Sequence, residues 1–463
     1  MKSQLSQRAM ALADQRLALT DSKVTGDWSR PAVWCQPIHT VYIPANSFFS
    51  GTDLNTAPDL PRKWGQEVLS VLQSQPGADS DPYEGARKLA EFLNIEHSSR
   101  VAELAVQKLQ QEPIEDVRID FEDGFTQRGV PVTSRDSQES DFAVRAADLV
   151  SQWLLGEVRV APAFCGIRFK SFDPTVRKRG IETLTLFLSR LQELGALHAL
   201  YAPDSHRYNP RALRLTFPKV QEASQVSALV EILEMLEAEW GLDKAGARIN
   251  FEIQVETPQA VVGDNGAVEA ARLITAAQGR CLSLHYGTYD YSAFLGVDPA
   301  QQSMEHPVAD LAKGLLQVVA RGRGVELSDG STNRIPVGPV TAMREAWALH
   351  YRLVTRHLNR GIRQGWDLHP NQLITRHLAT SAYFRRDWEL SARRLKAYLG
   401  GDTTEWMDEP ATAKMLASFL RRAHACGAIT DDEVHMADAT VEQLAQLESN
   451  GHLPYTPGGG FQS

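Results

Sequence analysis

Short segments of apolar and β-branched residues alternate with longer helix-like segments along most of this chain of 463 residues. Strands that alternate with helices are typical of βαβ units, which build a parallel sheet. Eight such units indicate a (β/α)8 barrel. The strand-like segments lie at residues 39–43, 117–121, 166–169, 213–217, 250–255, 281–286, 325–327 and 366–368.

A doubly wound open sheet is the alternative architecture, and it usually carries a glycine-rich G-x-G-x-x-G turn after its first strand. Here the first strand-like segment is followed by helical patterns at 61–75 and 84–93, without that turn. We therefore predict an α/β fold, a TIM barrel over residues 36–380 with an N-terminal helical extension at 1–35. For residues 381–463 we predict a C-terminal helical extension that ends in a flexible, glycine-rich tail.

Composition excludes several classes of protein. The chain has 48 Lys and Arg against 57 Asp and Glu, a net charge of −9, whereas a dedicated nucleic-acid binder needs a basic face. We find no apolar run of about 18 residues and no signal-peptide core, so no membrane contact is expected. Four scattered cysteines without a C-x-x-C pair argue against a zinc ribbon or a disulfide framework and favour a cytoplasmic location.

Ionisable side chains follow every expected strand but the first, at the end where a parallel barrel carries its catalytic groups. Glu256 and Asp290 are candidate ligands of Mg²⁺, which prefers oxygen donors, and the alternative is a pair of solvated or ion-paired acids at strand ends. Arg168 suits a substrate carboxylate or carbonyl oxygen, or else forms a structural ion pair with Glu122, Asp123 or Glu256. The other residues at these strand ends are Glu122, Asp123, Lys219, Asp329 and His369.

Structural explanations are also available for Lys219, Asp329 and His369. A lysine at a strand end often pairs with a neighbouring acid, Asp329 lies in an Asp-Gly turn, and His369 precedes a proline. We nevertheless predict that Lys219, Asp329 and His369 contribute to substrate binding. Asp329, His369 or a metal-bound water are the candidates for the general base.

Six segments in order resemble motifs of one family. They are VRIDFEDGF at 117–125, GIRF at 166–169, LTFPKV at 215–220, FEIQVETPQAV at 251–261, LHYGTYDYSAFLG at 284–296 and GWDLHPNQL at 365–373. In this order they resemble the HpcH/HpaI aldolase and citrate lyase β-subunit-like superfamily. The resemblance implies a phosphoenolpyruvate/pyruvate-type TIM barrel with a divalent metal, usually Mg²⁺, with Mn²⁺ as a substitute.

The resemblance also assigns roles. Glu256 and Asp290 fall on the family's metal ligands, and Arg168 falls on its substrate-orienting arginine. Glu122 and Asp123 fall on the acidic pair of the second strand, which acts on the waters of the metal. The aldolase branch has a histidine after that acid, and Gly124 follows here, which favours the citrate lyase and malyl-CoA lyase branch.

The expected activity is therefore that of a metal-dependent carbon–carbon lyase or aldolase that works through an enolate. Its substrate would be a keto acid or a hydroxyacyl compound, with acyl-CoA as one form, and the protein would be a homo-oligomer without nucleic-acid partners. Two alternatives stay open. One is a thioester hydrolase on the same metal site, and the other is a catalytically silent, ligand-binding member.

Overall fold

A computed structural model describes residues 2–25, 36–49, 57–201, 205, 208–401, 404–406 and 408–450. Cys35 and the tail expected at 457–463 lie outside these residues. Among the described helices, none is both long and apolar enough to cross a membrane.

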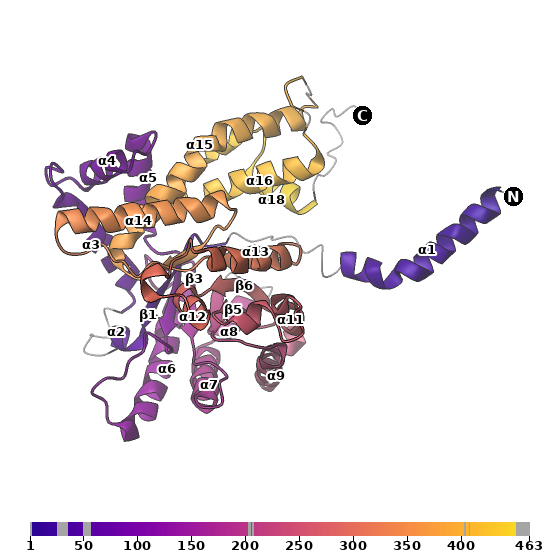
Figure 1. The fold of residues 1–463 in the computed structure, drawn as a ribbon, viewed down its shortest axis with the longest axis horizontal. Coiled ribbons are helices and arrows are strands. Elements are labelled where there is room, and N and C mark those ends of the chain that lie inside the picture. Colours follow the sequence, from indigo (N-terminus) through magenta and orange to yellow (C-terminus); the bar gives the residue numbers. More distant parts are fainter. Residues whose placement is uncertain are drawn as a thin grey trace.

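Eight parallel strands form one sheet in the order β7-β6-β5-β4-β3-β2-β1-β8. The two outer strands also meet, because a bridge joins Ser328 to Gln364 and the Asp329 backbone N–H donates to the Gln364 carbonyl at 2.8 Å. The sheet is therefore a closed barrel, and the predicted TIM barrel is confirmed (Figure 1). Its strands are β1 (His39–Pro44), β2 (Asp116–Asp120), β3 (Phe164–Arg168), β4 (Leu213–Phe217), β5 (Phe251–Val255), β6 (Cys281–Tyr286), β7 (Glu326–Ser328) and β8 (Gly365–Asp367).

Helices surround the barrel. Four described helices, α2 to α5, lie between β1 and β2, where the sequence predicted two. The helices that follow the strands are α2 (Ala45–Phe49), α3 (Leu60–Gln73), α4 (Pro82–Phe92), α5 (Ser98–Gln111), α6 (Val132–Leu154), α7 (Arg177–Glu193), α8 (Ala196–Tyr201), α9 (Ala223–Glu239), α10 (Pro258–Val261), α11 (Glu269–Ala276), α12 (Thr288–Phe294), α13 (Pro307–Arg321), α14 (Val340–Asn359) and α15 (Leu373–Leu399).

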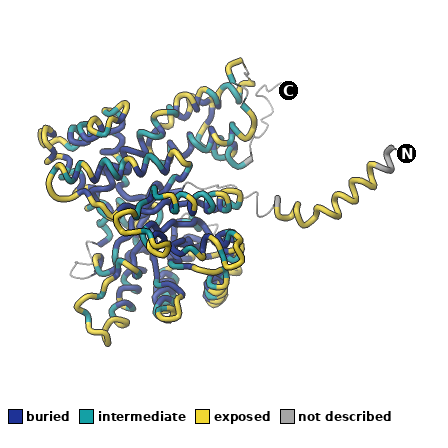
Figure 2. The backbone as a smooth tube through the Cα atoms, viewed as in Figure 1, coloured by how far each residue is buried: buried dark blue, intermediate teal, exposed yellow. Residues whose placement is uncertain are grey.

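The extensions differ in how they pack. At the N-terminus, α1 (Lys2–Thr25) points away from the barrel, and its described side chains are exposed (Figures 1 and 2). At the C-terminus, α15 packs against α16 (Pro410–Ala425), which packs against α18 (Val441–Asn450), and α17 (Asp431–His435) lies beside them. This unit has its own apolar core, and residue 380, the expected domain boundary, lies within α15.

The strands place apolar side chains outward and polar ones inward. In β4, Leu213, Leu215 and Phe217 pack under the helices, whereas Arg214 and Thr216 point into the barrel. This differs from most TIM barrels, whose interior is filled mainly by branched apolar residues. The period-2 pattern nevertheless produces strands that are buried on both faces.

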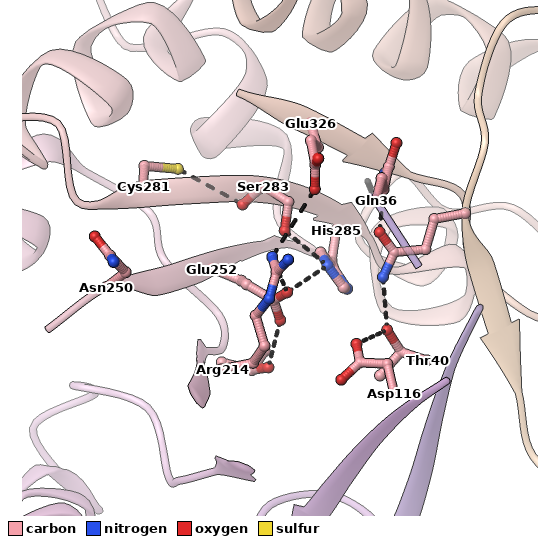
Figure 3. Close-up of polar contacts among 12 residues, drawn as sticks. Gln36, Thr40, Asp116, Arg214, Asn250, Glu252, Cys281, Ser283, His285 and Glu326 are labelled. Carbon is pink, nitrogen blue, oxygen red and sulfur yellow. Dashed lines mark hydrogen bonds and ion pairs between the residues drawn. The ribbon is translucent and has the colours of Figure 1, made fainter. Parts of the chain in front are cut away.

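Charged groups inside the barrel pair with one another (Figure 3). Arg118 donates to Glu252 at 2.7 Å and also pairs with Asp116, which in turn accepts from Thr40 at 2.7 Å. Glu252 is also 3.4 Å from Arg214. Because removal of one partner of a buried pair typically costs about 3–5 kcal/mol, this network favours a single strand register.

A second buried network attaches α14 and α15 to the barrel. Asp367, at the end of β8, accepts from His39 at 2.7 Å and lies 3.0 Å from His350 Nε2. Arg376 of α15 donates to Asp367 from Nε and Nη2 at 3.0 and 2.9 Å. Arg376 also donates from Nη1 to His357 at 2.9 Å, so this histidine is an acceptor and is neutral.

Burial lowers the pKa of His357 to about 3 and also lowers the pKa values of His350 and His377. The unfolded chain takes up these protons near pH 6.5, and the folded protein does not. Stability from these groups is therefore fully present above about pH 6.5 and is lost as the pH falls below it. For one such histidine the loss between pH 6.5 and 5 is about 2 kcal/mol.

We expect His357→Gln to reduce the loss of unfolding free energy between pH 7 and pH 5, measured by urea denaturation. A glutamine amide accepts from Arg376 and donates to the Ile362 carbonyl, as His357 does, but takes up no proton. Lys63→Gln, an exposed substitution on α3, is the control. Equal pH slopes in wild type and His357→Gln would contradict this account.

Candidate active site

The carboxyl ends of the strands bring the acidic residues to one mouth of the barrel. After β2, Asp120 accepts the backbone N–H groups of Glu122 and Gly124 at 2.9 and 3.0 Å, which folds the loop back on itself. This turn presents Glu122 and Asp123 to the barrel axis. Glu256 directly follows β5 and Asp290 lies in the first turn of α12, after β6.

Three carboxylates converge at this mouth. Asp123, Glu256 and Asp290 each offer one oxygen, and these oxygens all lie within 4.8 Å of one another. Glu256 is buried, whereas the side chains of Asp123 and Asp290 are 47% and 41% exposed. The structure thus brings the two predicted metal ligands together and adds Asp123, for which the sequence implied only an indirect role.

Asp123, Glu256 and Asp290 form a trio of acids in which burial and close packing raise the pKa values of Glu256 and Asp290. Burial, together with the charges of Glu122 and Asp290, raises the pKa of Glu256 to about 8, although Arg168 opposes the shift. Burial and Asp123 also raise the pKa of Asp290. Oxygen donors of like charge in one place fit a hard divalent cation, which removes the repulsion between them.

The backbone around Glu256 leaves no room for adjustment. A Cβ atom on Gly287 would lie 2.4 Å from Glu256 Cγ, so only glycine fits between β6 and this carboxylate. Glu256 accepts hydrogen bonds from the Gln254 amide and, at 3.1 Å, from the backbone N–H of Lys219. Glu256 is therefore held in one orientation.

Arg168 is paired with Asp120, a residue that the sequence analysis did not single out. Its Nε and Nη2 donate to the two Asp120 oxygens at 2.7 Å each, and Nη1 is 3.3 Å from Gln254 Oε1. Glu122, one of the partners considered from the sequence, is farther away at 3.7 Å. Asp120 and Arg168 are direct neighbours in the parallel β2–β3 ladder, a register that no single sequence segment reveals.

The guanidinium of Arg168 also lies over the ring of Tyr42, 4.9 Å from its centroid. This stacking and the bidentate pair hold the cation in one plane. Arg168 thus has a fixed position at the floor of the mouth, below the acidic trio.

Lys219 lies among the acids. Its Nζ is 2.6 Å from Asp123, 2.9 Å from Glu122 and 4.0 Å from Asp290. Its backbone has φ of 50°, in the left-handed region that non-glycine residues rarely adopt. The expected pairing of Lys219 with a neighbouring acid is present, and it involves the acids of the site itself.

Asp329 and His369 follow β7 and β8 but have other partners. Asp329 is buried, and both its oxygens lie 2.9 Å from Nζ of Lys313 in α13. His369 accepts the backbone N–H of Asn371 at 3.1 Å and so caps the short helix after β8. Their substrate-binding role stays a prediction, and their described contacts do not join them to the trio.

Comparison with solved structures finds similarity to proteins named citrate lyase, malate synthase and HpcH/HpaI aldolase/citrate lyase family protein. A citrate lyase from Burkholderia xenovorans LB400 is 19% identical, with 73% of this chain and 92% of that chain covered and a TM-score of 0.49. Haloferax volcanii malate synthase, in a magnesium/glyoxylate complex, is 14% identical over 89% of this chain and 98% of that chain, with a TM-score of 0.44. Likenesses this distant assign no activity.

An HpcH/HpaI aldolase/citrate lyase family protein from Burkholderia cenocepacia J2315 is 15% identical, with 58% of this chain and 85% of that chain covered and a TM-score of 0.32. A search of the curated proteins finds no match. One family model, described as a domain of unknown function (DUF6986), matches residues 17–452 and thus the barrel and both extensions. The chain therefore belongs to the DUF6986 family.

Proposed function

We propose that this protein is a carbon–carbon lyase or aldolase that depends on a divalent cation and acts through an enolate. Its substrate would be a 2-keto acid or a hydroxyacyl compound. The observation that carries the proposal is the convergence of Asp123, Glu256 and Asp290 within 4.8 Å at the mouth of the barrel, with the Arg168 guanidinium nearby.

Asp123, Glu256 and Asp290 are the residues that would hold the cation. Three carboxylate oxygens, with water for the remaining positions, suit Mg²⁺, and Mn²⁺ accepts the same donors. When bound, such a cation supplies Lewis acidity to the oxygens of a keto acid.

Arg168 would stabilise negative charge on substrate oxygen. Because Asp120 and Tyr42 hold its guanidinium in one place, no reorganisation is needed when the charge develops. Removal of one such preorganised donor typically costs about 3–4 kcal/mol of transition-state stabilisation.

Proton transfer is assigned to Glu122. Asp329 pairs with Lys313 and His369 caps a helix, whereas Glu122 lies at the mouth, 2.9 Å from Lys219 and 3.7 Å from Arg168. A carboxylate at the mouth can accept a proton from a bound substrate and return it.

Enolate formation can be tested before the natural substrate is known. We expect the protein with Mg²⁺ to exchange the methyl protons of pyruvate with D₂O, measured by NMR. EDTA should abolish the exchange, and Mg²⁺ or Mn²⁺ should restore it. Glu256→Gln protein is the control for exchange by free cation. Full exchange in cation-free buffer would refute the role of the trio. The same measurement should be made with acetyl-CoA. If the protein exchanges the methyl protons of neither compound, the proposed enolate chemistry is wrong.

Assays with a panel of acyl-CoA compounds distinguish cleavage from hydrolysis. A lyase breaks the carbon skeleton, and the proposal predicts a shortened acyl-CoA together with a keto acid. Release of free CoA with an intact skeleton would instead show a thioester hydrolase.

We expect Arg168→Lys to slow proton exchange at least tenfold, which corresponds to about 1.4 kcal/mol. Lysine keeps the positive charge but replaces the two parallel bonds to Asp120 with a single point contact. Exchange rate and melting temperature should be measured together. A lower melting temperature with an unchanged rate would leave Arg168 only a structural role.

We expect Glu256→Gln and Asp290→Asn to lose Mg²⁺ binding, measured by titration calorimetry, while their cation-free melting temperatures stay level with wild type or rise. Each change removes a carboxyl group whose ionised form its neighbours repel. In Glu256→Gln the amide oxygen can still accept from the Lys219 N–H, and Gln254 can turn its own oxygen to the new NH₂ group at the loss of its 3.3 Å contact with Arg168. If each acid instead belonged to a stabilising buried pair, the loss would be about 3–5 kcal/mol, and Mg²⁺ binding would not change.

A further inference from the structure

Lys219 contacts each member of the acidic trio. Its ammonium is 2.6 Å from Asp123 and 4.0 Å from Asp290, and its backbone N–H donates to Glu256 at 3.1 Å. The ammonium therefore offsets the charge of Asp123 and Asp290, while the Arg168 guanidinium acts on Glu256. A divalent cation held by the trio would need Asp123, which is the closest partner of the ammonium.

We propose that Lys219 exchanges partners when the cation binds. Without the cation, its ammonium neutralises the acids; when the cation enters, the ammonium leaves them and receives the anionic group of the substrate. This inference rests on the proposed function, because it requires a divalent cation at Asp123, Glu256 and Asp290.

The first half of the proposal follows from charge. An ammonium 2.6 Å from Asp123 would be a close neighbour of any cation on that carboxylate, and like charges at such a distance repel. The cation also removes the negative charge that attracts the ammonium. The flexible four-carbon stem of lysine lets the head group move while the backbone contact with Glu256 stays in place.

The second half of the proposal, in which the ammonium receives the substrate, follows from the exposure of the Lys219 side chain. The Lys219 side chain is 30% exposed, whereas that of Arg168 is 6% exposed, and three nitrogens of Arg168 already face Asp120 and Gln254. An anion that arrives at the mouth thus meets the Lys219 ammonium before it meets Arg168. Cation binding would prepare the site for the substrate by releasing this group.

The test is the Mg²⁺ affinity of Lys219→Met, measured by titration calorimetry on the full chain. Methionine has a similar length, the same backbone N–H and the same cost of a left-handed φ, so the ammonium is the principal difference. We expect Mg²⁺ to bind Lys219→Met at least tenfold more tightly than wild type. The cation-free variant should also melt at a lower temperature, because the acids lose their counter-charge.

Lys178→Met is the matched control. Lys178 is exposed on α7, so its removal changes the net charge equally without a described contact to the trio. Equal affinities of Lys219→Met and Lys178→Met for Mg²⁺, or weaker binding by Lys219→Met, would overturn the proposal. Glu256→Gln separates the two hypotheses: if it still binds Mg²⁺, the proposed cation site is wrong. If Glu256→Gln loses Mg²⁺ and Lys219→Met is unchanged, only the exchange is wrong.

Oxalate tests the transfer to the substrate, because it is a planar dianion similar in shape to the enolate of pyruvate. At saturating Mg²⁺, we expect oxalate to bind wild type at least tenfold more tightly than Lys219→Met. Equal oxalate affinities would overturn the second half of the proposal. Absence of Mg²⁺ binding by both wild type and Lys219→Met would overturn the proposal and the cation site together.

Discussion

Mutual repulsion among the carboxylates at the barrel mouth is the constraint on which this site depends. Asp123, Glu256 and Asp290 come from the ends of three different strands, and the barrel brings their oxygens within 4.8 Å of one another. Other groups compensate this repulsion: the Lys219 ammonium and backbone N–H, the Gln254 amide and the Arg168 guanidinium. The site thus combines a buried Glu256, held in one orientation, with two more exposed carboxylates that contact the Lys219 ammonium.

The polar interior of the barrel makes this rigidity possible. Arg118, Asp116 and Glu252 occupy the positions that apolar residues fill in most TIM barrels. A buried pair contributes little net stability, but a shift of register would leave each charge without its partner. Nearer the mouth, Asp120 and Arg168 form another buried ion pair of this kind. The outward apolar residues therefore supply the folding free energy, and the inward charges determine where the strand ends lie.

Much of the barrel was predictable from the sequence, because eight buried strands with a period of two alternate with helices and carry clear stop signals. Two helices before β2, α2 and α5, were not predicted: α2 spans only five residues, and the N-cap of α5, His97, makes no side-chain capping bond. Glu256 and Asp290 were predictable from their positions after strands. The partner of Asp329 was not, because Lys313 comes from a helix whose facing side depends on packing. The Asp120–Arg168 pair required the β2–β3 register, which no single segment reveals.

The left-handed backbone at Lys219 connects the end of β4 with the acidic trio. Strain of this kind costs of order 1–3 kcal/mol and persists only where surrounding structure enforces it. Here the conformation directs the Lys219 N–H to Glu256 while the side chain extends to Asp123. The strained conformation is thus the one in which a single residue orients the buried Glu256 through its backbone and places its ammonium between Asp123 and Glu122.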